Sequence, residues 1–186
     1  RLLEHLRGSA RHLVEEVRGK VSVGQVQKTL QALLGEGVSI RDLETILESV
    51  SDAADVEGDG ADLVATARRA LAPRLGQQWA SADGSLPCVV LDEALEQRLL
   101  RELSAPAMGG GEPDGGAPPD GLLGQLQAGL DELRGQGRKP VVLCDPQVRP
   151  VVRGWLESAG PGAAVLGYDE VDSVNVKAIT TVGTSS

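Results

Sequence analysis

Apolar residues recur at helical spacing in two adjacent segments near the start of the chain. A period of three to four residues places such positions on one face of an α-helix, where they can pack against a core. Residues 22–50 therefore predict two amphipathic helices joined by a short connection, which form a helical hairpin. The apolar positions are Val26, Leu30, Leu33 and Leu34 in the first helix and Leu43, Ile46, Leu47 and Val50 in the second.

Each helix of the predicted hairpin carries its own start signal. Ser22 with Gln25, and Ser39 with Asp42, have the spacing of a capping box. In that motif the serine oxygen accepts a hydrogen bond from a free backbone N–H of the first helical turn. We therefore expect the two helices to begin at these serines.

Helical periodicity extends over residues 1–78. After the hairpin we expect a loop rich in Asp and Gly from Asp52 to Asp62, followed by one more helix. We expect Pro73 to end or kink that helix. These features predict a small all-helical subdomain.

The pattern changes after Trp79, where short apolar runs replace the helical stripes. Residues 88–91 and 141–144 are such runs, and each is typical of a buried strand. Asp92 can cap the helix after the first strand, and Asp145 with Pro146 can begin the helix after the second. Two more strands are expected, at Ala164–Leu166 and Val174–Val182. The order of strands and helices predicts a short, mainly parallel sheet flanked by helices.

The expected fold class is therefore α+β multidomain, with a helical subdomain at 1–78 and an α/β subdomain at 79–186. Within the second subdomain, residues 104–121 are dominated by Gly and Pro. Such a segment buries too little apolar surface to offset the entropy of ordering, so we expect a mobile loop there.

Composition narrows the possible partners. The net charge is −9, and the chain has two Trp, one Tyr and no Phe. An acidic surface repels phosphate backbones and anionic lipids, and few aromatic rings are present to stack on bases. These numbers argue against nucleic-acid binding and favour basic or neutral protein partners. No stretch reaches the about twenty apolar residues of a membrane-spanning helix.

Candidate catalytic and metal-binding residues are few. Cys88 and Cys144 lie in strand-like apolar runs, where a buried reduced thiol is commoner than a disulfide. Asp145 superficially resembles a phosphorelay acceptor, but a helix-capping role is favoured. His5 and His12 stand too far apart on one helix to chelate zinc from adjacent turns. We therefore predict no catalytic, metal or cofactor site, and no enzyme activity.

A longer run of residues carries a family resemblance. The segment GQVQKTLQALLGEGVSIRDLETILESVSDAA resembles the signature of the cytoplasmic domain of the type III secretion export gate family. The segments GQQW, VLDEALEQRLL, RKPVVLCDPQVRP and VLGYDEV resemble their equivalents in the flagellar branch of that family. The residues QQW and DEALEQ and the length of the tail favour this branch over the virulence injectisome branch. The sequence departs from the family at Gly167 and Asp169, where many members have Ser and Asn.

The resemblance implies a role in protein export. Members of the family combine a membrane-embedded half with a cytoplasmic region of four subdomains, and this chain, which starts at Arg1 inside a helical pattern, is expected to be a C-terminal fragment holding most of the third and all of the fourth. The implied location is the cytoplasmic face of the bacterial inner membrane. The implied partners are other copies of the chain in a nonameric ring, export chaperones with bound substrates, the stalk protein of the export ATPase and other membrane proteins of the gate.

Nine residues are candidate contacts in protein interfaces. For the exposed corner of the hairpin, the alternatives are a local capping role and a contact with a neighbouring subunit, and both stay open. For Trp79, a core or junction role is favoured. For the acidic turn of Tyr168, Asp169 and Glu170, an ordinary surface role is favoured. The candidates are Val38, Ser39, Ile40, Arg41, Asp42, Trp79, Tyr168, Asp169 and Glu170.

Other classes of function remain possible from sequence alone. One alternative is a virulence injectisome gate, and another is a phosphorelay or enzyme-like module in the α/β half. A third is an adaptor that binds its partners as a monomer.

Overall fold

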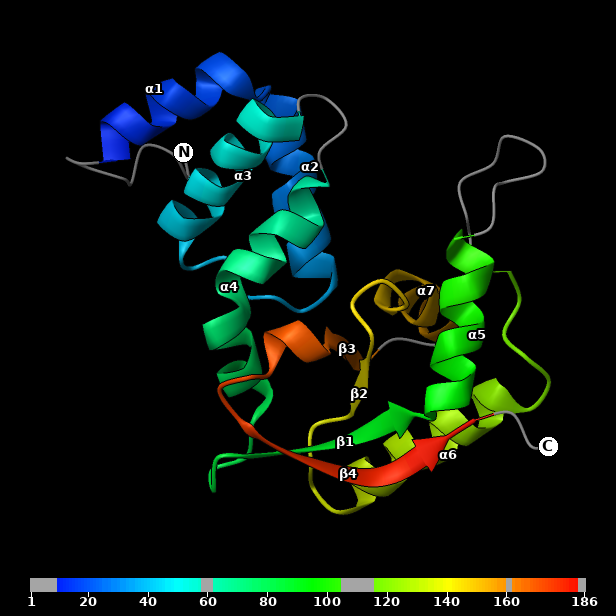
Figure 1. Cartoon of the computed structure of the whole chain (residues 1–186). Coiled ribbons are helices and arrows are strands. Elements are labelled where there is room, and N and C mark those ends of the chain that lie inside the picture. The colour runs from blue at the N-terminus through cyan, green and yellow to red at the C-terminus, as the bar shows by residue number, and fades with distance from the viewer. Residues whose placement is uncertain (1–9, 58–61, 105–115, 160–161, 184–186) are drawn as a thin grey trace. The chain divides into compact units, whose positions relative to one another are not determined.

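The structure is a computed structural model that describes residues 10–57, 62–104, 116–159 and 162–183 (Figure 1). The chain divides into two compact units, Arg1–Leu75 and Gly76–Ser186. The boundary between the units lies within helix α4 (Leu63–Trp79), as does the boundary expected after residue 78. Each unit has its own apolar core and is described by itself.

The first unit is helical, and its core is built from aliphatic side chains. It contains α1 (Ala10–Lys20), α2 (Val23–Gly35), α3 (Leu43–Glu57) and the first part of α4. The predicted stripes of the hairpin supply much of the core, because Leu33, Ile46 and Leu47 are 0–1% exposed. Of the predicted stripe residues, Leu34 is exposed. The residues before Ala10, including Leu2, lie outside the described residues.

The predicted start of α2 is confirmed. Ser22 Oγ accepts a hydrogen bond from Gln25 N at 3.2 Å, and Gln25 Oε1 accepts one from Ser22 N at 2.9 Å, so both bonds of a capping box are present.

A serine cap contributes roughly 1 kcal/mol. We expect Ser22→Ala to lower the free energy of unfolding by about that amount in urea titrations. Replacing exposed Gln27 by Ala, on the same helix, should change it by less than about 0.5 kcal/mol.

One local prediction in this unit was wrong and two were wrong in part. Helix α3 starts at Leu43, with Asp42 rather than Ser39 as its cap: Asp42 Oδ1 accepts from Thr45 N at 3.4 Å and Oδ2 accepts from Thr45 Oγ1 at 2.8 Å. The same helix continues through Asp52 to Glu57, because Ala53 extends its buried face. Pro73 lies inside α4 and does not end it, and the alternative of a kink stays a prediction.

The second unit is an α/β fold with one sheet, as predicted. The four strands are β1 (Ser85–Leu91), β2 (Val141–Cys144), β3 (Ala164–Gly167) and β4 (Asn175–Val182). All neighbouring strands are parallel, and the order across the sheet is β3-β2-β1-β4. Cys88 pairs with Ala178 and Val89 with Thr180, so β4 has one extra residue, Ile179, which forms a bulge.

Helices α5 (Glu93–Ser104), α6 (Leu122–Gly135) and α7 (Arg149–Ala159) pack against one face of the sheet. Alternation along the strands divides the core, because in β2 Val142 and Cys144 point to these helices while Val141 and Leu143 point to the other face. On that other face the core includes Val171, with Trp79 and Val174 packed at its border.

One sequence signal for a helix start in this unit holds and one is shifted. Asp92 Oδ1 accepts from Leu95 N at 2.7 Å, as expected for the cap of α5. Asp145 accepts from Gln147 N at 2.7 Å, but a turn intervenes and α7 begins only at Arg149. Most of the predicted Gly/Pro loop, residues 105–115, lies outside the described residues.

Candidate functional site

The exposed corner of the hairpin, residues 38–42, joins α2 to α3. Val38 is buried, Ile40 is half-buried, and Ser39 and Arg41 are exposed. Asp42 is half-buried and forms an ion pair with Arg74 besides capping α3. The corner therefore has a packed base, and Arg41 is its exposed charged side chain.

Trp79, at the end of α4, has a structural setting. Its ring packs at the border of the core on the sheet face opposite α5–α7. Lys139 Nζ lies 6.0 Å from the ring centroid and donates a hydrogen bond to Gln78 O at 2.5 Å. The distance of 6.0 Å to the ring centroid is the outer limit of a cation–π contact. Trp79 therefore belongs to the border of the core of the second unit.

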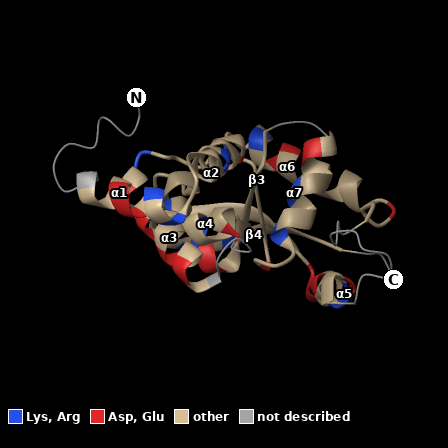
Figure 2. Cartoon of the chain, turned by 90° about the horizontal axis from the view of Figure 1, so that it is seen from above, with Lys and Arg blue, Asp and Glu red and all other residues tan. Residues whose placement is uncertain are grey.

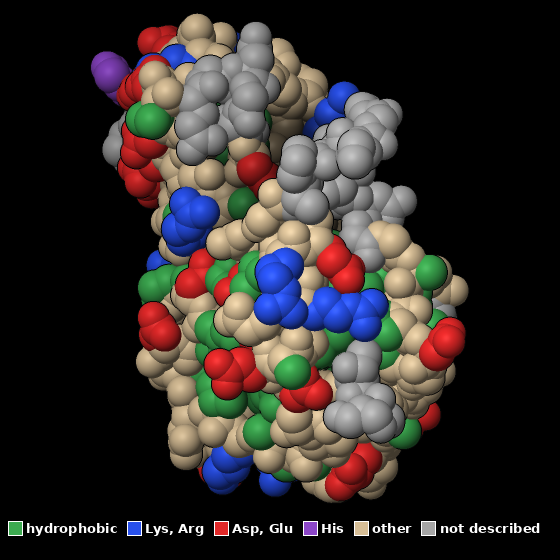
Figure 3. All heavy atoms as spheres, turned by 45° about the vertical axis from the view of Figure 1, so that its right-hand side comes forward, with side chains coloured by type: hydrophobic (Ala, Val, Ile, Leu, Met, Phe, Trp, Pro, Cys, Tyr) green, Lys and Arg blue, Asp and Glu red, His purple; other side chains and the backbone are tan. Residues whose placement is uncertain are grey.

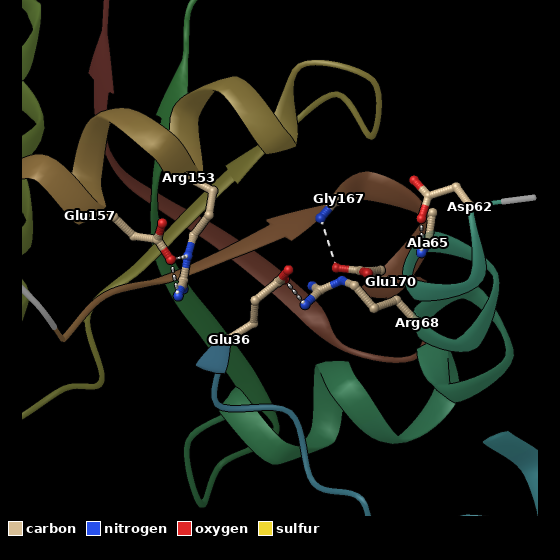
Figure 4. A network of polar contacts seen from close by, with 8 residues as sticks. All are labelled: Glu36, Asp62, Ala65, Arg68, Arg153, Glu157, Gly167 and Glu170. Atoms are coloured by element: carbon tan, nitrogen blue, oxygen red, sulfur yellow. Dashed lines mark hydrogen bonds and ion pairs between the residues drawn. The ribbon is translucent and has the colours of Figure 1, made fainter. Parts of the chain in front are cut away.

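A 3₁₀ turn, η3 (Tyr168–Glu170), follows β3 and holds the other three candidates. Glu170 is 4% exposed, and its carboxylate accepts from Gly167 N at 2.9 Å (Figure 4). Asp169 is exposed and Tyr168 is 39% exposed. A β-carbon added at Gly167 would collide with Asp169 Oδ1, so a larger residue at position 167 would require the Asp169 side chain to move.

Glu96 connects this turn to the carboxyl end of β2. Its Oε1 accepts from Asp145 N at 2.9 Å and from Tyr168 Oη at 3.2 Å. Burial raises the pKa of Glu96, and burial together with the charge of Glu96 raises the pKa of Tyr168. Both groups are thus engaged in holding the turn against α5.

Neither cysteine has the environment of a nucleophile. Cys88 and Cys144 are free thiols with no exposed surface. Burial raises the pKa of Cys88 to about 11, and burial also raises the pKa of Cys144. A reactive thiolate needs a lowered pKa and access to solvent. Within the described residues, no group of three His, Cys, Asp or Glu side chains converges as metal ligands do.

We expect both thiols to resist a disulfide reagent in the native state at pH 8 and to react fully once urea unfolds the chain. The raised pKa of Cys88 also predicts a pH effect. The unfolded thiol loses its proton near pH 9 and the folded thiol near pH 11, so the free energy of unfolding should fall as the pH rises through this window. Fast labelling in the native state would contradict the burial of these thiols.

A buried ion pair in the helical unit was not expected from the sequence. Arg68 is 2% exposed, and its Nη1 lies 2.6 Å from Glu36 Oε2 (Figure 4). The available signal was the position of Arg68, one residue after buried Ala67 and three before buried Leu71, which places it on the apolar side of α4.

Among the residues that the structure describes, no helix has the length and apolar character needed to cross a membrane.

Comparison with known proteins places the chain in a family. The model of the FHIPEP family matches residues 1–175. The flagellar biosynthesis protein FlhA of Salmonella typhimurium is 35% identical over 184 residues, which cover 98% of this chain and 26% of that protein. The chain thus spans about a quarter of the length of this relative.

Solved structures have the same fold. The nonameric EscV cytosolic domain from the type III secretion system, determined by cryo-electron microscopy, superposes with a TM-score of 0.72 at 26% identity, over 97% of this chain and 54% of that one. CdsV in the Chlamydia pneumoniae CdsV and CdsO complex gives a TM-score of 0.77 at 24% identity, over 97% and 54%. The second likeness shows the fold alone. From the family match, the chain is a member of the FHIPEP family.

Proposed function

We propose that this chain forms part of the cytoplasmic ring of a type III protein export gate, with the helical unit in its third subdomain and the α/β unit in its fourth. The observation that carries the proposal is the family match over residues 1–175. The nonameric assembly of the EscV cytosolic domain supports a ring, because that domain has the same fold.

In this role the ring docks export chaperones with their substrates and the stalk protein of the export ATPase, and passes unfolded proteins to a membrane channel. The complex of CdsV with CdsO supports docking of a second protein on this fold. The chain would contribute binding surfaces rather than covalent chemistry, which agrees with the burial of both thiols and the capping role of Asp145.

We assign the chain to the flagellar branch. It is 35% identical to a flagellar protein and 26% identical to the EscV domain of a secretion system. A virulence injectisome gate is the second candidate, since the fold is shared. Restored swimming of a flagellar gate mutant by a chimaera carrying residues 1–186 would support the first, and restored secretion only in an injectisome mutant would support the second.

We propose residues 38–42 as a contact between neighbouring subunits of the ring. Arg41 is exposed on a connection whose base, Val38, is buried, so the corner can present a charge in a fixed position. Tyr168 and Asp169 form a second candidate surface on the other unit. Glu170 supports the second surface from within, since it is buried and accepts from Gly167 N, and Trp79 packs at the core border of the same unit.

Charge reversal tests the ring contact. In a complete cytoplasmic domain, we expect Arg41→Glu to shift sedimentation from the ring towards the monomer, because the exposed cation would become an anion at the contact. Lys28→Glu makes the same change of charge at an exposed position of α2 and should leave assembly unchanged. Equal sedimentation of wild type and Arg41→Glu would contradict the assignment of this corner.

A further inference from the structure

We infer that a pocket between α1 and α3 is a binding site for an arginine side chain presented by a basic segment of a partner protein. The pocket has a volume of about 510 Å³. Helix α1 contributes one part of its wall and α3 the other. The lining residues are His12, Leu13, Glu16, Glu44, Glu48, Ser51 and Asp52.

The charge of the pocket comes from the spacing of acidic residues along α3. Glu44, Glu48 and Asp52 follow one another at intervals of four, so they share one face of the helix. Figure 2 shows acidic residues gathered on α1 and α3, and Figure 3 shows them beside a histidine. All three are exposed, and none of them has an ion-pair partner among the described residues. Like charges at this spacing repel, which is a cost that a bound cation would remove.

Glu16 is already partly neutralised. Lys20 Nζ lies 2.7 Å from Glu16 Oε1 and 2.6 Å from Asp55 Oδ2, and it joins α1 to α3 at one end of the same interface. Among the described residues, the carboxylates of Glu44, Glu48 and Asp52 have no such ion pair. A cation held between carboxylates of the two helices stabilises their contact, and Lys20 supplies it only for Glu16 and Asp55.

Ser51 gives an independent sign of a missing ligand. The residue is 1% exposed, and its hydroxyl is the buried side-chain group without a hydrogen-bond partner in the described part of the chain. Ser51 lines the same pocket. An unpaired buried hydroxyl costs roughly 1–3 kcal/mol, so a rotation of the Ser51 side chain towards a bound donor regains that energy. The unpaired hydroxyl of Ser51 is an observation separate from the acidic charge of the pocket.

The arrangement of the polar residues that line the pocket favours a guanidinium group over a metal ion. Metal coordination needs a convergent cluster, and the described residues hold no group of three that could form one. Arginine carries five N–H donors in a planar fork, which suits several carboxylates and a hydroxyl at once. Its aliphatic stem can lie along Leu13, which is half-buried at the rim of the core. The net charge of −9 favours such a basic partner at long range.

The test uses the chain of residues 1–186 and a blocked peptide, acetyl-Gly-Arg-Gly-amide, followed by heteronuclear NMR. We expect saturable shifts of the Leu13 methyl groups and of the Ser51 and Glu48 amides, with a dissociation constant on the order of 1 mM for this single side chain. The same peptide with citrulline in place of arginine keeps the shape and removes the charge, and it should cause no shifts. Equal shifts with citrulline would overturn the proposal.

Variants separate the site from the general acidity of the chain. We expect Glu48→Gln to weaken binding of the arginine peptide roughly tenfold, the loss of one charge-assisted hydrogen bond. Glu15→Gln removes the same charge from α1 outside the pocket and should leave the affinity within twofold. Equal effects of the two changes would overturn the site. Tighter binding of free spermidine than of the peptide would overturn the assignment of a protein partner.

Ser51→Ala gives a test that does not depend on loss of folding. We expect the melting temperature of the free chain to rise by about 2 °C, because an unpaired buried hydroxyl is removed. Affinity for the arginine peptide should fall about threefold at the same time. A variant that is more stable and binds as well as wild type would show that Ser51 has no part in the site. This test stands apart from ring assembly, which is measured by sedimentation.

Discussion

Replacing Arg68 by alanine should lower the free energy of unfolding of the helical unit by about 3–5 kcal/mol, the cost of breaking a buried ion pair. The Arg68 side chain is 2% exposed, and Glu36, its partner at 2.6 Å, is 17% exposed. Removal of the guanidinium leaves the Glu36 carboxylate in a poorly solvated place and leaves a space beside Ala67. The loss should appear as a lower urea midpoint at unchanged slope.

The neighbouring residue supplies the control. Arg69→Ala removes the same charge and the same number of atoms from an exposed position of α4, and it should cost less than about 0.5 kcal/mol. A second arm pairs Arg68→Met with Glu36→Gln. Replacing both charges by uncharged side chains often restores stability, so this double variant should be more stable than Arg68→Ala. Similar midpoints for Arg68→Ala and Arg69→Ala would show that the ion pair does not stabilise the unit.

The second large effect is expected at Trp155 in the α/β unit. Trp155→Ala should cost about 3–5 kcal/mol, the usual range for truncating a buried tryptophan. The ring is 5% exposed in the core between the sheet and α5–α7. Its Nε1 donates to Gly116 O at 2.8 Å, so it also fastens the chain just before α6.

Two readouts separate packing from the hydrogen bond. Trp155→Phe keeps most of the apolar contact and removes the donor, so it should cost clearly less than Trp155→Ala. In both variants Trp79 is the remaining tryptophan, and its fluorescence reports the same unit. Circular dichroism should give the same midpoint. If Trp155→Phe were as costly as Trp155→Ala, the hydrogen bond and not the packing would be the main contribution.

Much of the fold could be predicted because its signals are local. The capping box of Ser22 and Gln25, the cap at Asp92 and the apolar runs of β1 and β2 each depend on residues within one turn or one strand. Parallel pairing followed from the order of these elements. The family resemblance came from a long run of residues, and the match over 1–175 confirms it.

The errors arose where packing decides between local alternatives. Ser39 and Asp42 both offer a side-chain oxygen, but Val38 is buried in the core and the chain becomes helical only after Asp42. Pro73 lacks an N–H, yet buried Leu71 and Leu75 hold α4 on both sides of it. In these cases tertiary contacts outweighed the propensity of single residues.

The candidate sites could be predicted only in part. Sequence pointed to Arg41 as an exposed charge at a corner, and its role in assembly stays a prediction. The pocket between α1 and α3 was not expected, because it exists only once two helices lie side by side. The spacing of Glu44, Glu48 and Asp52 is visible in the sequence, but the unpaired hydroxyl of Ser51 is not.

The strand order has a consequence for synthesis on the ribosome. Among the strands of this sheet β1 is translated first and β4 last, yet β1 lies between β2 and β4. Until β2 and β4 have been translated, the apolar strand β1 has no sheet partner on either side. Unpaired strand edges of this kind can associate with other chains. The core of α1–α3 and of α4 up to Leu75 lies within the first unit, so the ribosome-bound chain should acquire these helices early and complete its sheet last.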